Sequence, residues 1–180
     1  MKINPILALD VLVCAAASCA KEGIALTYLN QDAQIEKYVS DQLSKIEGSR
    51  ASFENDTARL VVREGSGEAL RDGGTVAFYY AGYVFTGSLS TLFATNNEDV
   101  AQSAGWSGLS GEDRYSVQVA DLSGGQLLEG LRRGLVGVRP GEECLILFNG
   151  KLGYGRKVQG TIPAGSALAY HIWVIDIENK

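Results

Sequence analysis

The stretch ALAYHIWVIDI, residues 167–177, decides the fold class of this chain. Every second residue from Leu168 to Val174 is apolar or aromatic, whereas His171 and Trp173 fall between them. A side-chain period of two is that of a β-strand with two different faces. We therefore predict a strand over this stretch, with the Leu168 face turned toward the core.

Shorter stretches with the same period lie upstream of it. They cover residues 60–62, 76–81, 115–119 and 144–148. Residues 127–138 have the pattern of a short helix, and residues 93–114, rich in Gly, Ser, Asn and Asp without a sustained period, predict a long loop. Several strands with one short helix late in the chain predict an α+β domain with a mostly antiparallel sheet.

Composition restricts the classes of function. The chain has 180 residues, 46% of them hydrophobic, which allows one core with an appended arm. A net charge of -5 without a basic run argues against nucleic acid or an anionic membrane surface as partner. With a single histidine, and with Cys144 alone in an apolar strand, neither a metal site, a cofactor nor a catalytic triad is predicted.

The first 19 residues have the layout of a secretory signal. An apolar stretch over residues 3–17 follows Met1-Lys2, and at about 15 residues it is too short for a permanent transmembrane helix. Small residues precede Cys19, whose placement resembles a bacterial lipobox, in which the cysteine is acylated and becomes the new N-terminus. We expect a signal peptide over residues 1–18 and a lipid anchor at Cys19 that holds the protein in the cell envelope, on the periplasmic or the surface side. Plain secretion is the alternative.

Residues 19–55 predict a tether followed by an amphipathic helix. The small and polar residues 19–28 suit a tether. A helix is then expected from Asn30 or Asp32 to Gly48, with an apolar stripe that packs on the domain or on a second copy of the chain. A homodimer through this helix is therefore one predicted assembly. The stripe consists of Ile35, Val39, Leu43 and Ile46.

Four segments bear on function through their joint order in residues 56–180. They are FYYAG at residues 78–82, LLEGL at 127–131 with Gly134-Leu135, RPGE at 139–142, and LGYG at 152–155 with Ile162-Pro163. Together they resemble the FKBP-type peptidyl-prolyl isomerases, over residues 60–177. The resemblance implies a twisted antiparallel sheet wrapped around a short helix, with a hydrophobic pocket between them that binds proline-containing polypeptides.

The same resemblance assigns the site residues. It implies isomerisation of Xaa-Pro bonds of exported proteins, with the backbone N–H of Leu128 and the hydroxyl of Tyr154 donating to substrate carbonyls. The residues implied as catalytic are Tyr80, Phe93 and Tyr154, and those implied as substrate-binding are Leu127, Leu128, Leu131, Ile162 and Tyr170.

Two positions depart from the family pattern. Phe93 is followed by Ala94 where the family has an aspartate, and Leu131 stands where tryptophan is common. The expectation is therefore peptide binding with weak to moderate isomerase activity. A non-catalytic proline-peptide-binding or chaperone module at the membrane is the second hypothesis, and an assembly subunit that dimerises through the helix is the third.

Overall fold

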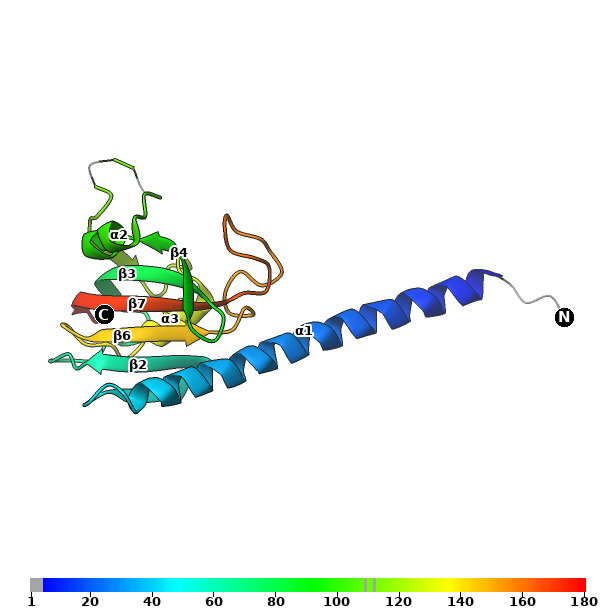
Figure 1. Ribbon diagram of the computed structural model, residues 1–180, viewed down its shortest axis with the longest axis horizontal. Coiled ribbons are helices and arrows are strands. Elements are labelled where there is room, and N and C mark those ends of the chain that lie inside the picture. Colours follow the sequence, from blue (N-terminus) through cyan, green and yellow to red (C-terminus); the bar gives the residue numbers. More distant parts are fainter. Residues whose placement is uncertain (1–4, 109, 112) are drawn as a thin grey trace.

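The computed structural model describes residues 5–108, 110–111 and 113–180, with side chains from Glu22 onward. The fold is α+β, as predicted, with a sheet of antiparallel strands, a long N-terminal helix and two short helices (Figure 1). The elements in chain order are α1 (Pro5–Leu43), β1 (Arg50–Glu54), β2 (Thr57–Arg63), β3 (Thr75–Phe85), β4 (Leu89–Thr95), α2 (Glu98–Ala104), β5 (Gln118–Asp121), α3 (Glu129–Leu135), β6 (Glu143–Phe148) and β7 (Ala167–Glu178).

β7 occupies the centre of the sheet. The strand order is β1-β2-β6-β7-β3-β4, and β5 pairs separately with β3. Within this order Tyr170 lies opposite Gly82 on β3 and Ile146 on β6. The strand predicted over residues 167–177 is thus confirmed, and hydrogen bonds to both neighbours fix its register.

The inner face of the sheet packs on α3. The residues of β7 from Leu168 to Val174 that were predicted to face the core are at most 6% exposed. Two glycines let α3 approach β6 closely: a Cβ atom on Gly130 would lie 2.2 Å from the Phe148 ring, and one on Gly134 would lie 2.2 Å from Ile146. Glycine at these two positions sets the distance between helix and sheet.

The outer face of the sheet packs on α1, which runs beside β2 and continues past the end of the sheet (Figure 1). Ile35 and Val39 are at most 4% exposed, and Tyr38 contacts Phe85 edge to face, with 5.3 Å between the ring centroids. Leu43, the third residue of the predicted stripe, is 38% exposed, and the fourth, Ile46, lies beyond the helix, which ends at Leu43 rather than at the predicted Gly48. The part of the stripe that packs on the domain covers Ala58, Leu60, Leu145, Leu147, Ala167 and Ala169.

The N-terminal arm differs from its prediction. α1 begins at Pro5 rather than at Asn30 or Asp32, so residues 19–28 are helical instead of an irregular tether. The physical reason is that this segment holds alanine, leucine, lysine and glutamate, which favour helix. The side chain of Cys19, the predicted lipidation site, lies outside the described residues, as do residues 1–4 of the predicted signal. In the part of the chain with described side chains, no helix is long and apolar enough to cross a membrane.

The loop predicted over residues 93–114 was wrong in part, because β4 ends inside it and α2 follows. β4 is an edge strand whose burial does not alternate, so its sequence lacks the period of two. Asn97 caps the start of α2, where its side chain accepts a hydrogen bond from the Val100 N–H at 3.2 Å, and Gly105, with φ of 60°, caps its end. The strand predicted over residues 115–119 lies at Gln118–Asp121, and the helix over 127–138 is shortened to Glu129–Leu135.

Candidate functional site

A pocket of about 420 Å³ opens between the inner face of the sheet, the start of α3 and the loop of residues 149–166, called here the pocket loop. Ala94 and three glutamines also contribute to its lining. The structure brings together all eight residues that the sequence assigned to the site: Tyr80, Phe93, Leu127, Leu128, Leu131, Tyr154, Ile162 and Tyr170 line this one pocket.

Tyr170 joins the aromatic walls of the pocket. It stacks on Phe148 with 6.0 Å between ring centroids, and it contacts Phe93 edge to face at 5.7 Å. The Tyr80 ring lies 6.2 Å from it. Gly82 makes room for this cluster, because a Cβ atom there would lie 2.6 Å from the Phe93 ring. The glycine of the FYYAG segment is therefore a steric requirement of the pocket wall.

The pocket presents hydroxyl groups without charge. Burial, and then the nearby Tyr154, raises the pKa of both Tyr80 and Tyr170 above the usual value for a phenol. These two hydroxyls therefore stay protonated at neutral pH and can donate hydrogen bonds. Among the described residues that line the pocket there is no Asp, Glu, Lys, Arg or His.

Leu128 supplies a backbone donor at the pocket. It is the N-cap residue of α3 and it lines the pocket. The first N–H groups of a helix have no partner within the helix. The Leu128 N–H lies at this end of α3, and its donation to a substrate carbonyl, the role that the resemblance implies for it, stays a prediction.

Asn96, a buried residue behind the pocket wall, was not predicted from the sequence. Its Oδ1 accepts a hydrogen bond from the Tyr80 N–H at 2.7 Å, and its Nδ2 donates to the Ser116 carbonyl at 2.9 Å. The neighbouring Thr95 hydroxyl donates to the Tyr80 carbonyl at 2.6 Å. These two side chains, at the end of β4 and directly after it, hold the Tyr80 backbone in place. Thr95 and Asn96 are polar, as loop residues commonly are, so nothing in these two residues indicated an ordered site. The only sequence signal of regular structure at this point is Asn97, a residue type that commonly caps helices.

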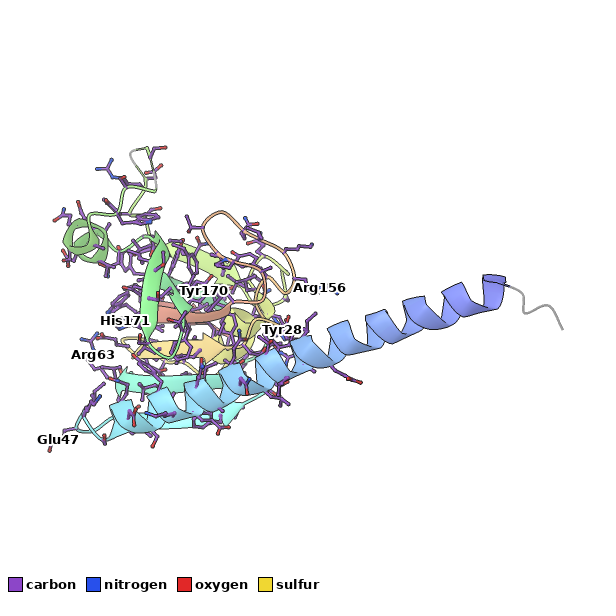
Figure 2. All side chains as sticks on the ribbon, turned by 45° about the vertical axis from the view of Figure 1, so that its right-hand side comes forward. Tyr28, Glu47, Arg63, Arg156, Tyr170 and His171 are labelled. Atoms are coloured by element: carbon purple, nitrogen blue, oxygen red, sulfur yellow. The ribbon has the colours of Figure 1, made fainter. Side chains whose placement is uncertain are left out.

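The pocket loop carries Tyr154 and Ile162 and is connected to α3. The Gly130 N–H donates to the Leu152 carbonyl at 3.0 Å, and Ile162 pairs with Gln159 in an isolated bridge. Figure 2 shows Tyr170 within the domain, Arg156 on the pocket loop, and Tyr28 on the part of α1 that leaves the domain.

Known proteins resemble this chain in sequence. Residues 67–175 match the family model described as FKBP-type peptidyl-prolyl cis-trans isomerase. The human peptidyl-prolyl cis-trans isomerase FKBP10 is 32% identical over 111 residues, which are 61% of this chain and 16% of that protein. The FK506-binding protein 1 of Aspergillus oryzae is 25% identical over 120 residues, 66% of this chain and 96% of that protein.

Solved structures share the fold. FkpA from Escherichia coli superimposes with a TM-score of 0.55 at 20% sequence identity, over 98% of this chain and 74% of that one. The three FKBP domains of wheat FKBP73 give a TM-score of 0.56 at 17% identity, over 73% of this chain and 50% of that one.

The family match covers more than half of the chain and contains every residue assigned to the pocket. The chain therefore belongs to the FKBP-type peptidyl-prolyl cis-trans isomerase family.

Proposed function

We propose that this chain accelerates the cis–trans isomerisation of Xaa-Pro peptide bonds in exported polypeptides. The observation that carries the proposal is the pocket itself, which combines aromatic walls with two placed hydrogen-bond donors and, among the described residues, no charged side chain. Its aromatic and leucine surfaces suit a prolyl ring. The family to which the chain belongs supports this activity.

Such a pocket suits the chemistry of amide rotation. The barrier of about 18–20 kcal/mol arises because rotation destroys the resonance of the amide. No covalent bond breaks, so the reaction requires neither a nucleophile nor a metal. Since the twisted amide is less polar than the planar one, a water-poor apolar pocket favours it. The Leu128 N–H and the Tyr154 hydroxyl would orient the chain on either side of the bond.

A second candidate function is binding of proline segments without efficient catalysis, as a chaperone module would use it. Ala94 and Leu131 favour it, because both line the pocket where the resemblance leads one to expect a carboxylate and an indole. A leucine leaves a less rigid floor for the prolyl ring than an indole would. Binding is therefore less affected by these two residues than turnover.

The N-terminal arm supports a proposal on location. Cys19 follows the small residues that precede cleavage in lipoprotein signals. An acyl chain there would anchor the protein in the cell envelope, with α1 between the anchor and the domain. Exported polypeptides near the membrane would then be its substrates.

The exposed part of α1 supports a proposal on assembly. Leu26 and Leu29 are 58% and 65% exposed, and Tyr28, which lies between them in the sequence, is on the part of α1 that leaves the domain (Figure 2). A second copy of α1 would cover these side chains. We therefore propose a homodimer that pairs through this part of the helix.

Replacement of Tyr154 tests the isomerase. In Tyr154→Phe one hydrogen bond to the twisted amide is lost, so kcat/KM should fall by about threefold to tenfold. NMR exchange spectroscopy on a proline-containing peptide reports binding and turnover in one sample. Tyr79→Phe, on the same strand as Tyr80 but not lining the pocket, is the matched control. Peptide binding without any acceleration by the wild type, even at high protein concentration, would sink the catalytic proposal and favour the binding module.

The uncharged pocket predicts a flat pH profile. kcat/KM should be constant from about pH 6 to about pH 9, because burial keeps the phenols of Tyr80 and Tyr170 protonated throughout this range. In Ala94→Asp, the profile recorded from about pH 4 upward should no longer be flat. Burial raises the pKa of the new carboxyl above its usual value of about 4, and kcat/KM should change over the pH range in which that carboxyl loses its proton. Ala94→Asn, of the same shape but neutral, should leave the profile flat. A pH-dependent change in the wild-type kcat/KM between about pH 6 and about pH 9 would contradict the prediction.

Lipidation is tested by labelling cells with a radioactive fatty acid. Label should enter the wild-type protein and be absent from Cys19→Ser, which should also leave the membrane fraction. Cys14→Ser, within the predicted signal, is the control and should retain the label. Equal labelling of Cys19→Ser and Cys14→Ser would show that Cys19 does not carry the lipid.

Dimerisation is tested by sedimentation velocity of the full chain. The pair Leu26→Glu and Leu29→Glu should shift the protein from dimer to monomer, because charges would be buried between the helices. Thr27→Glu, exposed but on a different face of α1 from Leu26 and Leu29, should leave the dimer intact. A monomeric wild type at micromolar concentration would refute the proposed assembly.

A further inference from the structure

The pocket loop is closed at its neck by backbone contacts between its two ends. The Gly155 N–H donates to the Gly150 carbonyl at 2.8 Å, and the Gly165 N–H donates to the Gly155 carbonyl at 2.6 Å. The ends approach so closely that a Cβ atom on Gly150 would lie 2.3 Å from the Gly165 carbonyl oxygen. Tyr154 and Ile162, which the loop presents to the pocket, depend on this neck for their position.

One side chain of α1 bridges the two ends of the neck. The Nε2 atom of Gln31 donates to the Gly165 carbonyl at 2.7 Å, and its Oε1 atom accepts from the Gly150 N–H at 3.0 Å. A carboxamide offers a donor and an acceptor on one planar group, which matches a carbonyl and an N–H side by side. Gln31 thus bonds to both ends of the pocket loop at once.

The next residue of α1 holds the start of the same loop. Asp32 accepts a hydrogen bond from the Asn149 side chain at 2.7 Å, and Asn149 in turn accepts from the Lys151 N–H at 3.1 Å. Asn149 is 5% exposed, so the donor side of this contact is buried, whereas Asp32 is half-buried.

Polar contacts, rather than apolar packing, join the helix to the loop at this point. Gln31 lies four residues before Ile35 and eight before Val39, on the face of α1 that docks on the sheet. Beside Gln31, however, an open groove of about 460 Å³ runs between the helix and the end of the pocket loop. The hydrogen bonds of Gln31 and Asp32 therefore carry the connection there.

We infer that Gln31 is a positioning residue of the peptide pocket, which together with Asp32 braces the pocket loop from α1 and so holds Tyr154 and Ile162 in place for the substrate. This inference rests on the proposed function of the same pocket. A glycine-rich loop without the brace would have to be ordered each time a peptide binds, and binding would bear that entropic cost. α1 then helps to build the peptide pocket by positioning the pocket loop, and it is also the N-terminal arm of the protein.

Gln31→Met tests the inference in the full chain, because methionine has a similar length and lacks the amide groups. The dissociation constant of a proline-containing peptide and KM should both rise by about threefold to tenfold, with kcat unchanged, since the ordering cost affects bound substrate and transition state equally. The Ile162 methyl signal should broaden in NMR spectra of the free protein. A purely structural role would lower the thermal midpoint and leave KM and this signal unchanged in the folded protein.

Gln34→Met is the matched control. Gln34 lies three residues further along α1 and lines the same groove, but it makes no hydrogen bond to the described residues of the pocket loop. Its replacement should leave KM and the Ile162 signal as in the wild type. Gln31→Glu keeps the acceptor for the Gly150 N–H but opposes a carboxylate to the Gly165 carbonyl, so it should be as impaired as Gln31→Met.

Loss of the brace and loss of isomerase activity give different results. Peptide affinity and an Ile162 signal that both stay within about twofold of the wild type in Gln31→Met would overturn the inference. A wild type that binds peptide but does not accelerate isomerisation would overturn the catalytic proposal alone, because affinity and the methyl signal still report on the brace.

Discussion

The register of β7 between β6 and β3 is the constraint on which the rest of the structure depends. The two faces of β7 serve two cores: Tyr170 points into the pocket, whereas Ala167 and Ala169 form part of the surface under α1. Because the side-chain period is two, a slip of one residue would exchange these faces. Tyrosine would then meet the helix and alanine the pocket. Both the site and the docking of α1 are therefore decided by the same hydrogen-bonded pairing.

The pocket wall follows from that register. Gly82 lies opposite Tyr170 on β3, and its missing side chain leaves the space that the Phe93 ring fills. Aromatic rings from β3, β4 and β7 then meet edge to face or at a tilt, which the charge distribution of such rings favours. The result is an apolar wall whose shape comes from strand pairing, so that the loops need to supply only the donors and the rim.

The sequence predicted those parts whose signal is local. β6 is a continuous apolar run over residues 144–148, β7 has larger core-facing side chains at every second position from Leu168 to Val174, and the pocket residues stand in motifs whose order is that of the family. β4 was not predicted, because the burial of this edge strand does not alternate along its length. Asn96 and Gln31 were missed for a different reason: their partners lie up to 20 and 134 residues away, and a polar side chain gives no sign in the sequence of such a distant partner. The start of α1 was misplaced because its residues favour helix well before the first capping candidates.

On the face of α1 that docks on the domain, the polar residue Gln31 precedes the apolar residues Ile35 and Val39. The surface beneath the helix explains this order. Val39 and Ile35 meet side chains of the outer sheet face, where apolar burial is the favourable contact. Four residues earlier the same face of the helix has passed the end of β6, and what it meets there is backbone at the neck of the pocket loop. An apolar side chain at this position would leave a buried N–H and a carbonyl without partners, which is costly. The change from isoleucine to glutamine along one helix face thus follows the change from sheet surface to loop backbone beneath it, and it connects the arm of the protein to its pocket.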